Sequence, residues 1–173
     1  MIKQFAQITS LVFFLLFTPK TYAQNSMAEA QAIFIYNFTR LIEWPPDYKT
    51  GDFVIGVYNS SEVFTQLTNY MNGKRVGGQN IKILKFNYIT DISKCHILFV
   101  SLNKTKDMTT LLGIVGTNKT LLITEKRGAL NEGSAINFVI IDDKLKFELK
   151  VSNAAKSGLK VHSNLEAMAV PAQ

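Results

Sequence analysis

The chain has 173 residues, a net charge of +6 and one cysteine. This length suits one domain with a sizeable core, and the mild charge lies on scattered lysines rather than a basic stripe, so nucleic acid is not an expected partner. A single cysteine excludes an internal disulfide. Cys95 opens an apolar run, which favours a buried thiol over a bond between two chains.

The N-terminal segment has the layout of a secretory signal peptide. Lys3 supplies a positive start, an apolar run covers 8–17, and 21–23 offers a cleavage site with small residues at its first and third positions. Cleavage would leave 24–173 as one exported domain with a net charge of +4, because Lys3 and Lys20 leave without an acid. An uncleaved anchor is the alternative, and no later segment is apolar for long enough to span a membrane.

The first element of the domain is predicted to be an amphipathic helix over 27–43. Ser26 suits the N-cap position, and Glu29 completes a capping box. Pro45 and Pro46 are expected to end the helix, because proline lacks an N–H and disfavours helix in the residue before it. The apolar stripe has helical spacing: Ala30, Phe34, Phe38 and Leu41.

The following segments alternate between buried strands and amphipathic helices. Strands are predicted at 53–58, 81–86, 95–101 and 120–125, and helices at 61–71 and 108–115. This alternation predicts a single α/β domain with a mostly parallel sheet flanked by helices.

The C-terminal part follows a different pattern. Apolar runs on either side of Asp142-Asp143 predict an antiparallel hairpin. Its second strand, 144–150, alternates apolar and charged residues, which is typical of a protected edge strand. Short helices at 151–157 and 164–170 are expected to end the chain.

The chain shows little sign of catalytic chemistry. Neighbours on a strand point to opposite faces, so Cys95 and His96 cannot hold one metal together. His162 lies in an expected connection, and we favour structural roles for both histidines. Hydrolase motifs are missing, and the Gly-rich stretch 73–80 precedes a strand, unlike a phosphate loop. We expect no catalytic residue, cofactor or metal.

An ordered series of motifs covers almost the whole expected domain. The motifs are Tyr36-Asn37-Phe38 with Glu43-Trp44-Pro45, Gly73–Gly78, His96–Ser101, Leu121–Thr124, Gly133–Phe138, and Phe147-Glu148-Leu149 followed by Ala154 and Gly158. Together, from about residue 27 to residue 170, they resemble the YfiR family. Two features depart from the family pattern: Lys150 stands where asparagine is frequent, and the paired cysteines of some members are reduced to one.

The resemblance implies a small, non-enzymatic periplasmic signalling protein. It would bind the periplasmic sensor region of an inner-membrane diguanylate cyclase or sensor kinase, and so modulate cyclic-di-GMP or phosphorelay output. The resemblance also suggests a homodimer.

The Trp-Pro-Pro corner after the first helix has two interpretations. In the first, which we favour, Trp44 packs against the sheet and the prolines direct the chain. In the second, Arg40, Glu43, Trp44 and Pro45 form the partner-binding surface, because aromatic and arginine side chains dominate binding hot spots. The second interpretation predicts that Trp44→Ala weakens binding without changing the melting temperature.

A second hypothesis belongs to another class, a periplasmic small-ligand-binding protein or ligand-responsive adaptor. Parallel α/β sheets bind ligands at the carboxyl ends of their strands, where the strand order reverses. Asn59, Ser101 and Glu125 each end a predicted buried strand. They are the expected lining of such a crevice.

Overall fold

The computed structural model describes residues 21–116 and 118–172, with all side chains except those of 21–26 and 107. Most of the predicted signal peptide therefore lies outside the described residues. A seven-stranded sheet forms the centre of the domain, in the order β3-β4-β2-β5-β6-β7-β8. Its strands are β2 (Phe53–Tyr58), β3 (Arg75–Val76), β4 (Gln79–Phe86), β5 (Ile97–Val100), β6 (Leu121–Thr124), β7 (Ile136–Ile141) and β8 (Lys144–Leu149).

The predicted mostly parallel sheet is confirmed. Strands β4, β2, β5, β6 and β7 are parallel neighbours, whereas β3 and β8 are antiparallel strands at the two edges. The chain starts the parallel set at β2, adds β4 on one side and then continues on the other side with β5. The strand order therefore reverses between β2 and β5.

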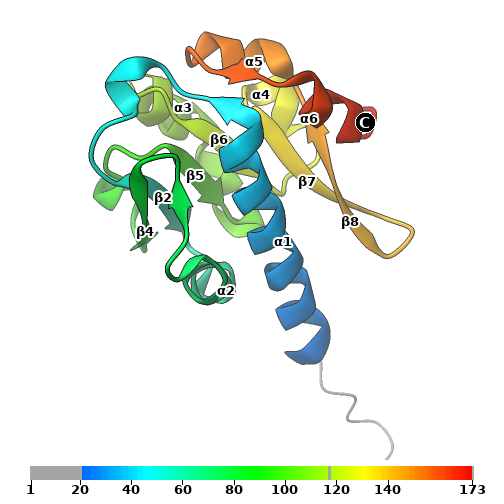
Figure 1. The fold of residues 1–173 in the computed structure, drawn as a ribbon. Coiled ribbons are helices and arrows are strands. Elements are labelled where there is room, and N and C mark those ends of the chain that lie inside the picture. Colours follow the sequence, from blue (N-terminus) through cyan, green and yellow to red (C-terminus); the bar gives the residue numbers. More distant parts are fainter. Residues whose placement is uncertain (1–20, 117, 173) are drawn as a thin grey trace, which may run out of the picture.

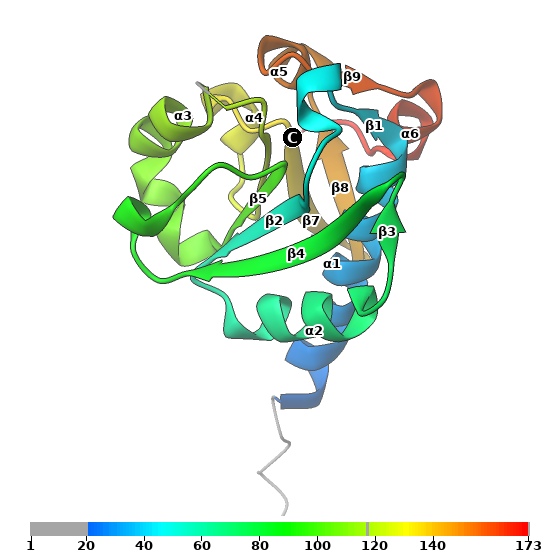
Figure 2. The ribbon, with the colours of Figure 1, turned by 60° about the vertical axis from the view of Figure 1, so that its left-hand side comes forward.

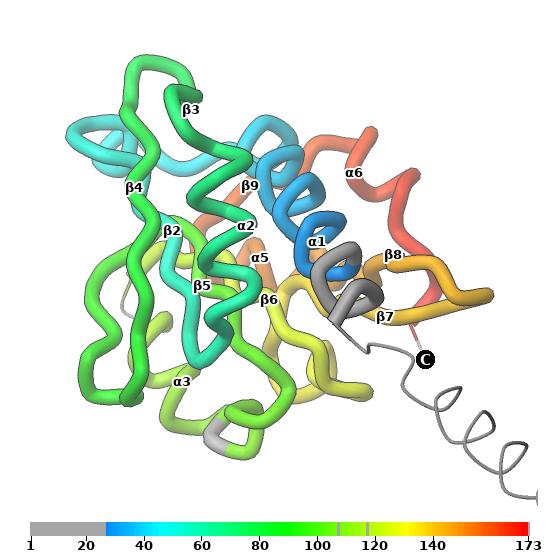
Figure 3. The backbone as a smooth tube through the Cα atoms, turned by 90° about the horizontal axis from the view of Figure 1, so that it is seen from below, coloured from blue at the N-terminus to red at the C-terminus, as the bar shows by residue number. Residues whose placement is uncertain are grey.

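Helices cover both faces of the sheet. α1 (Thr21–Leu41) and α2 (Ser61–Met71) pack on one face, and α3 (Met108–Gly116) packs on the other. Figures 1 and 3 show α1 and α2 side by side, with α3 across the sheet. None of the described helices combines the length and the hydrophobicity needed to cross a membrane.

The predicted boundaries of the first helix were wrong at both ends. α1 already includes Thr21, so Ser26 lies inside the helix rather than at its N-cap. Extension costs little once a helix has nucleated. The C-terminal end is shortened because Ile42–Glu43 forms β1, which pairs with β9 (Lys160–Val161).

The buried stripe of α1 also differs from the predicted one. Phe38 is fully buried as expected, but Ala30, Phe34 and Leu41 are only half-buried. The other apolar side chains that face the core are Ala28, Ala32 and Ile35. The stripe is displaced because α2 packs beside α1 and covers a second side of that helix.

The C-terminal hairpin and its turn follow the prediction. Asp142 and Asp143 have φ angles of 51° and 56°, the pair of positive values that a two-residue type I′ turn requires. β8 lies at the edge of the sheet, as its charge pattern indicates. The remaining described helices are short. Three are α-helices, α4 (Ala129–Glu132), α5 (Val151–Lys156) and α6 (Ser163–Met168), and the others are the 3-10 helices Pro46–Tyr48, Ile89–Asp91 and Leu102–Asp107.

A buried polar network joins β6, β7 and β8. Thr124 Oγ1 donates to Asn137 Oδ1 at 2.9 Å, and Asn137 Nδ2 donates to Glu148 Oε2 at 3.0 Å. All three side chains are buried, and a buried carboxylate requires such donors. The asparagine of the Ile-Asn-Phe motif and the glutamate of Phe-Glu-Leu therefore hold neighbouring strands together.

Candidate functional site

The corner after α1 is built around a buried tryptophan. Trp44 is only 4% exposed, and its Nε1 donates to the carbonyl oxygen of Lys119 at 3.1 Å. Its ring meets Phe53 edge-to-face, with centroids 5.0 Å apart. These contacts agree with the interpretation that Trp44 packs against the sheet, and they leave little of the indole exposed.

His96 connects this corner to the sheet. Its Nδ1 accepts from the backbone N–H of Val54 at 3.1 Å, and its Nε2 lies 2.8 Å from the carbonyl oxygen of Tyr48. Nε2 therefore carries the proton and donates. Burial lowers the pKa of His96, and the Lys94 charge acts in the same direction. His96 is a structural histidine, as predicted.

The other residues of the predicted partner surface lie outside this core. Arg40 and Glu43 are exposed and Pro45 is half-buried. Lys49 Nζ lies 2.9 Å from Glu43 Oε1, and this hydrogen bond lowers the pKa of the Glu43 carboxyl. Together with Trp44, Arg40 and Glu43 border a cavity of about 340 Å³ that also reaches His162 and the Gly77-Gly78 turn.

The three residues of the predicted crevice meet at the carboxyl ends of the central parallel strands, at the end of the sheet opposite the corner. The N–H of Ser101 donates to the carbonyl oxygen of Tyr58 at 3.2 Å, which places Ser101 beside Asn59. The next N–H, of Leu102, donates to Glu125 Oε2 at 3.2 Å. Asn59, Ser101 and Glu125 line one cavity of about 330 Å³. The three residues therefore come together at the carboxyl ends of the parallel strands, as predicted.

Glu125 has a partner that the sequence analysis missed. Gln31 of α1 is buried, and its Nε2 donates to Glu125 Oε1. Burial raises the pKa of Glu125, and the hydrogen bonds from Gln31 and Leu102 oppose that rise. The signal in the sequence was a glutamine among the apolar residues of an amphipathic helix.

Within 21–116 and 118–172, no group of three or more histidine, cysteine, aspartate or glutamate side chains is arranged to hold a metal ion. The two histidines have different surroundings. Both ring nitrogens of His96 contact backbone groups, whereas His162 is exposed. Neither the corner nor the crevice therefore contains a metal centre built from described residues.

A family model described as YfiR/HmsC-like matches residues 28–170. The chain belongs to this family. The match covers almost all of the domain expected after signal cleavage, and the family is one of periplasmic regulators associated with diguanylate cyclase signalling. No curated protein matches the chain.

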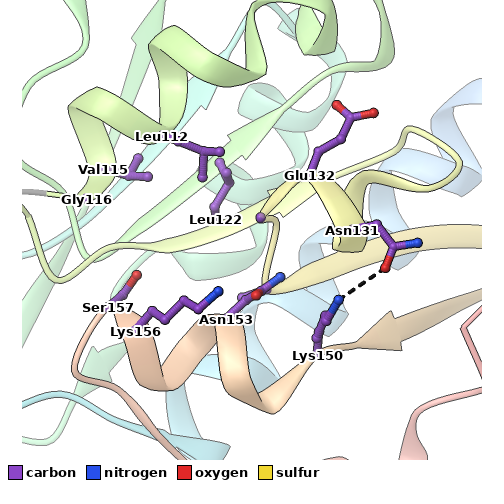
Figure 4. Close-up of a pocket in the computed structure, with 12 residues that line it drawn as sticks. Leu112, Val115, Gly116, Leu122, Asn131, Glu132, Lys150, Asn153, Lys156 and Ser157 are labelled. Atoms are coloured by element: carbon purple, nitrogen blue, oxygen red, sulfur yellow. Dashed lines mark hydrogen bonds between the residues drawn. The ribbon is translucent and has the colours of Figure 1, made fainter.

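Lys150, which stands where the resemblance leads us to expect asparagine, lines another cavity of about 330 Å³ (Figure 4). Lys150 occupies the N-cap position of α5 but makes no side-chain capping hydrogen bond. Its Nζ instead donates to Asn131 Oδ1 at 3.1 Å. The lysine therefore links α5 to α4 and leaves the start of α5 without a side-chain cap.

Proposed function

We propose that this protein is a non-enzymatic periplasmic regulator that binds the periplasmic sensor region of an inner-membrane diguanylate cyclase or sensor kinase. The observation that carries the proposal is the family match over 28–170, which spans the sheet and both helical layers. The organisation of the corner supports it, because the corner offers charged side chains on a rigid frame.

The regulator must bind one state of the sensor more tightly than the other, since only differential affinity shifts an equilibrium. Moving a two-state sensor from 10:90 to 90:10 requires a preference of roughly 80-fold, or about 2.6 kcal/mol. A few well-placed contacts supply free energies of that size.

The proposed contact surface is the exposed part of the corner, centred on Arg40 and Glu43. Both are exposed, and the Arg40 side chain makes no hydrogen bond or ion pair with another described residue. Trp44 has a positioning role in this proposal, because its indole fixes the backbone between α1 and the sheet. The cavity beside it gives an inserted partner side chain a place to bind.

The test is capture of the partner from solubilised membranes of the source organism. The full chain is exported with its own N-terminal segment, carries a tag at its C-terminus, and is compared with Arg40→Glu. Arg127→Glu is the matched control, because Arg127 is also exposed but follows β6, at the end of the sheet opposite the corner.

We expect the wild-type protein and Arg127→Glu to capture one membrane protein with a cyclase or kinase domain, and Arg40→Glu to lose it. Equal capture by all three proteins would exclude the corner as the contact surface. Absence of any membrane sensor at several salt and detergent concentrations would overturn the proposed function itself.

A further inference from the structure

The crevice lined by Asn59, Ser101 and Glu125 lies where the order of the parallel strands reverses. β2 and β5 are paired up to their last residues, and the segments after them separate, to α2 on one face and towards α3 on the other (Figure 2). Open α/β sheets bind ligands at this position because the diverging loops leave a space between them. Its volume of about 330 Å³ is within the range of small-molecule sites.

One polar atom of a residue that lines this crevice has no hydrogen-bond partner among the described residues. Ser101 is 8% exposed, and its Oγ is a buried side-chain oxygen of the described chain without a hydrogen bond. Leaving a buried hydroxyl unsatisfied costs free energy, so native structures rarely do so. Another buried serine, Ser134, shows the usual arrangement, since its Oγ lies 2.7 Å from the carbonyl oxygen of Ile136 and donates to it.

The electrostatics of the crevice select the sign of a ligand's charge. Glu62 and Glu125 are the charged side chains among its described lining residues, and none of those residues is basic. The start of α2 does not offset them, because Ser60 Oγ already accepts the N–H of Val63 and Glu62 lies in the first turn. An anionic ligand would meet two carboxylates, whereas a cationic one is attracted.

Glu125 retains the capacity to bind a cation. It accepts one hydrogen bond at each oxygen, from Gln31 and from Leu102. An ionised carboxylate offers about four acceptor positions, so about two remain. The rest of the wall is partly apolar, from Met27, Ala28 and Val63, which suits a short aliphatic chain rather than a hydrated metal ion.

We propose that this crevice binds a small aliphatic primary amine, with its ammonium group on the Glu125 carboxylate and the Ser101 hydroxyl accepting a second N–H bond. The ligand's carbon chain lies against Met27, Ala28 and Val63. Glu62, at the exposed rim, attracts the cation or a second ammonium group. The site is at the carboxyl ends of the parallel strands, at the end of the sheet opposite the corner. Its occupancy does not depend on the proposed sensor partner.

Three probes with the same four-carbon chain test the charge preference: 1,4-diaminobutane, 1,4-butanediol and succinate. Binding to the purified full chain is measured by calorimetry and by thermal shift at fixed ionic strength. We expect the diamine to bind and raise the melting temperature, and the diol and succinate to do neither. Stronger binding of succinate or the diol, or no binding by any probe, would overturn the proposal.

Variants then locate the site. Ser101→Ala and Glu125→Gln should each weaken diamine binding about tenfold or more, as expected for losing a hydrogen bond to a charged group. Ser152→Ala is the matched control, since Ser152 is exposed on α5.

Ser101→Ala should also retain or raise the melting temperature of the free protein, because the hydroxyl it removes is unsatisfied. Unchanged affinity in both Ser101→Ala and Glu125→Gln would place the amine elsewhere and overturn the assignment. Loss of partner capture with diamine binding intact would contradict only the regulator function, so the two proposals fail separately.

Discussion

The indole of Trp44 and the backbone of Lys119 are 75 residues apart in the chain and are joined by a hydrogen bond of 3.1 Å. Lys119 makes two further contacts with the same corner. Its N–H donates to the Tyr48 hydroxyl at 3.2 Å, and its Nζ lies 3.0 Å from the Asp47 carboxylate. The corner after α1 is thereby fastened to the segment that leads into β6.

Replacing this tryptophan should therefore unfold the protein more easily. We expect Trp44→Ala to cost about 3–5 kcal/mol, as for other buried aromatic truncations, which lowers Tm by roughly 10 °C in a domain of this size. Thermal melts followed by circular dichroism measure the change. Arg40→Ala, in the same corner but exposed, should melt like the wild type. A Trp44→Ala melt within 2 °C or so of the wild type would contradict the structural role and favour a contact role.

A replacement at Lys150 leads to a prediction of the opposite sign, a gain in stability. Lys150 has extended N-cap geometry, with φ −120° and ψ 94°, but no capping side chain. Lys150→Asn should supply an acceptor for a free N–H of the first turn of α5 and stabilise the protein by about 1 kcal/mol. Chemical denaturation measures the free energy of unfolding.

Two effects need to be separated in that experiment. Lys150→Ala reports the cost of losing the hydrogen bond to Asn131, and the same replacement at exposed Lys156 serves as the control. If Lys150→Asn is no more stable than Lys150→Ala, an asparagine at this position does not stabilise α5 by capping it.

The sequence predicted the elements with strong periodicity and missed those without it. The strands 53–58 and 121–124 and the helix 61–71 are apolar runs or stripes long enough to identify, and they occur where expected. β1 and β9 contain two residues each, which is too short for any period. Their pairing depends on tertiary contact between the two ends of the domain.

The candidate sites were predictable to different degrees. The crevice was predictable because parallel strands all end on the same side of a sheet, a rule that needs only the order of the elements. This rule brings together Asn59, Ser101 and Glu125. The burial of Trp44 could not be read from its neighbours, since its acceptor on Lys119 is distant in the chain. The same limit applies to Gln31, whose role depends on where α1 crosses the end of β6.

Cys95 should be inert until the protein opens. The thiol is buried, and burial raises its pKa to about 12, so very little reactive thiolate forms at neutral pH. We expect a disulfide reagent to label the native protein very slowly and the denatured protein at once. Thr120→Ala, which removes the hydrogen bond to the carbonyl oxygen of Cys95, should speed labelling by loosening this segment. Rapid labelling of the native protein, or a dimer that reductant dissociates, would show that the thiol is accessible.

His96 should make the fold sensitive to mild acid. Burial holds its folded-state pKa below the ordinary value of 6.5, so the unfolded chain binds the proton more readily. Neutral His96 therefore makes its full contribution to the free energy of unfolding above about pH 6.5. That contribution falls as the pH drops from there towards the folded-state pKa. Protonation also removes the Nδ1 acceptor of the Val54 N–H.

The measurement is urea denaturation of the wild type, His96→Gln and His162→Gln between pH 7.5 and pH 5. Glu125 contributes with the opposite sign, because its raised pKa favours protonation in the folded state, so the His96 contribution is the difference between wild type and His96→Gln. We expect the wild type to lose stability relative to His96→Gln below pH 6.5. His162→Gln, at an exposed position, is the control for replacing a histidine. Parallel slopes for the wild type and His96→Gln would show that His96 is not the titrating group.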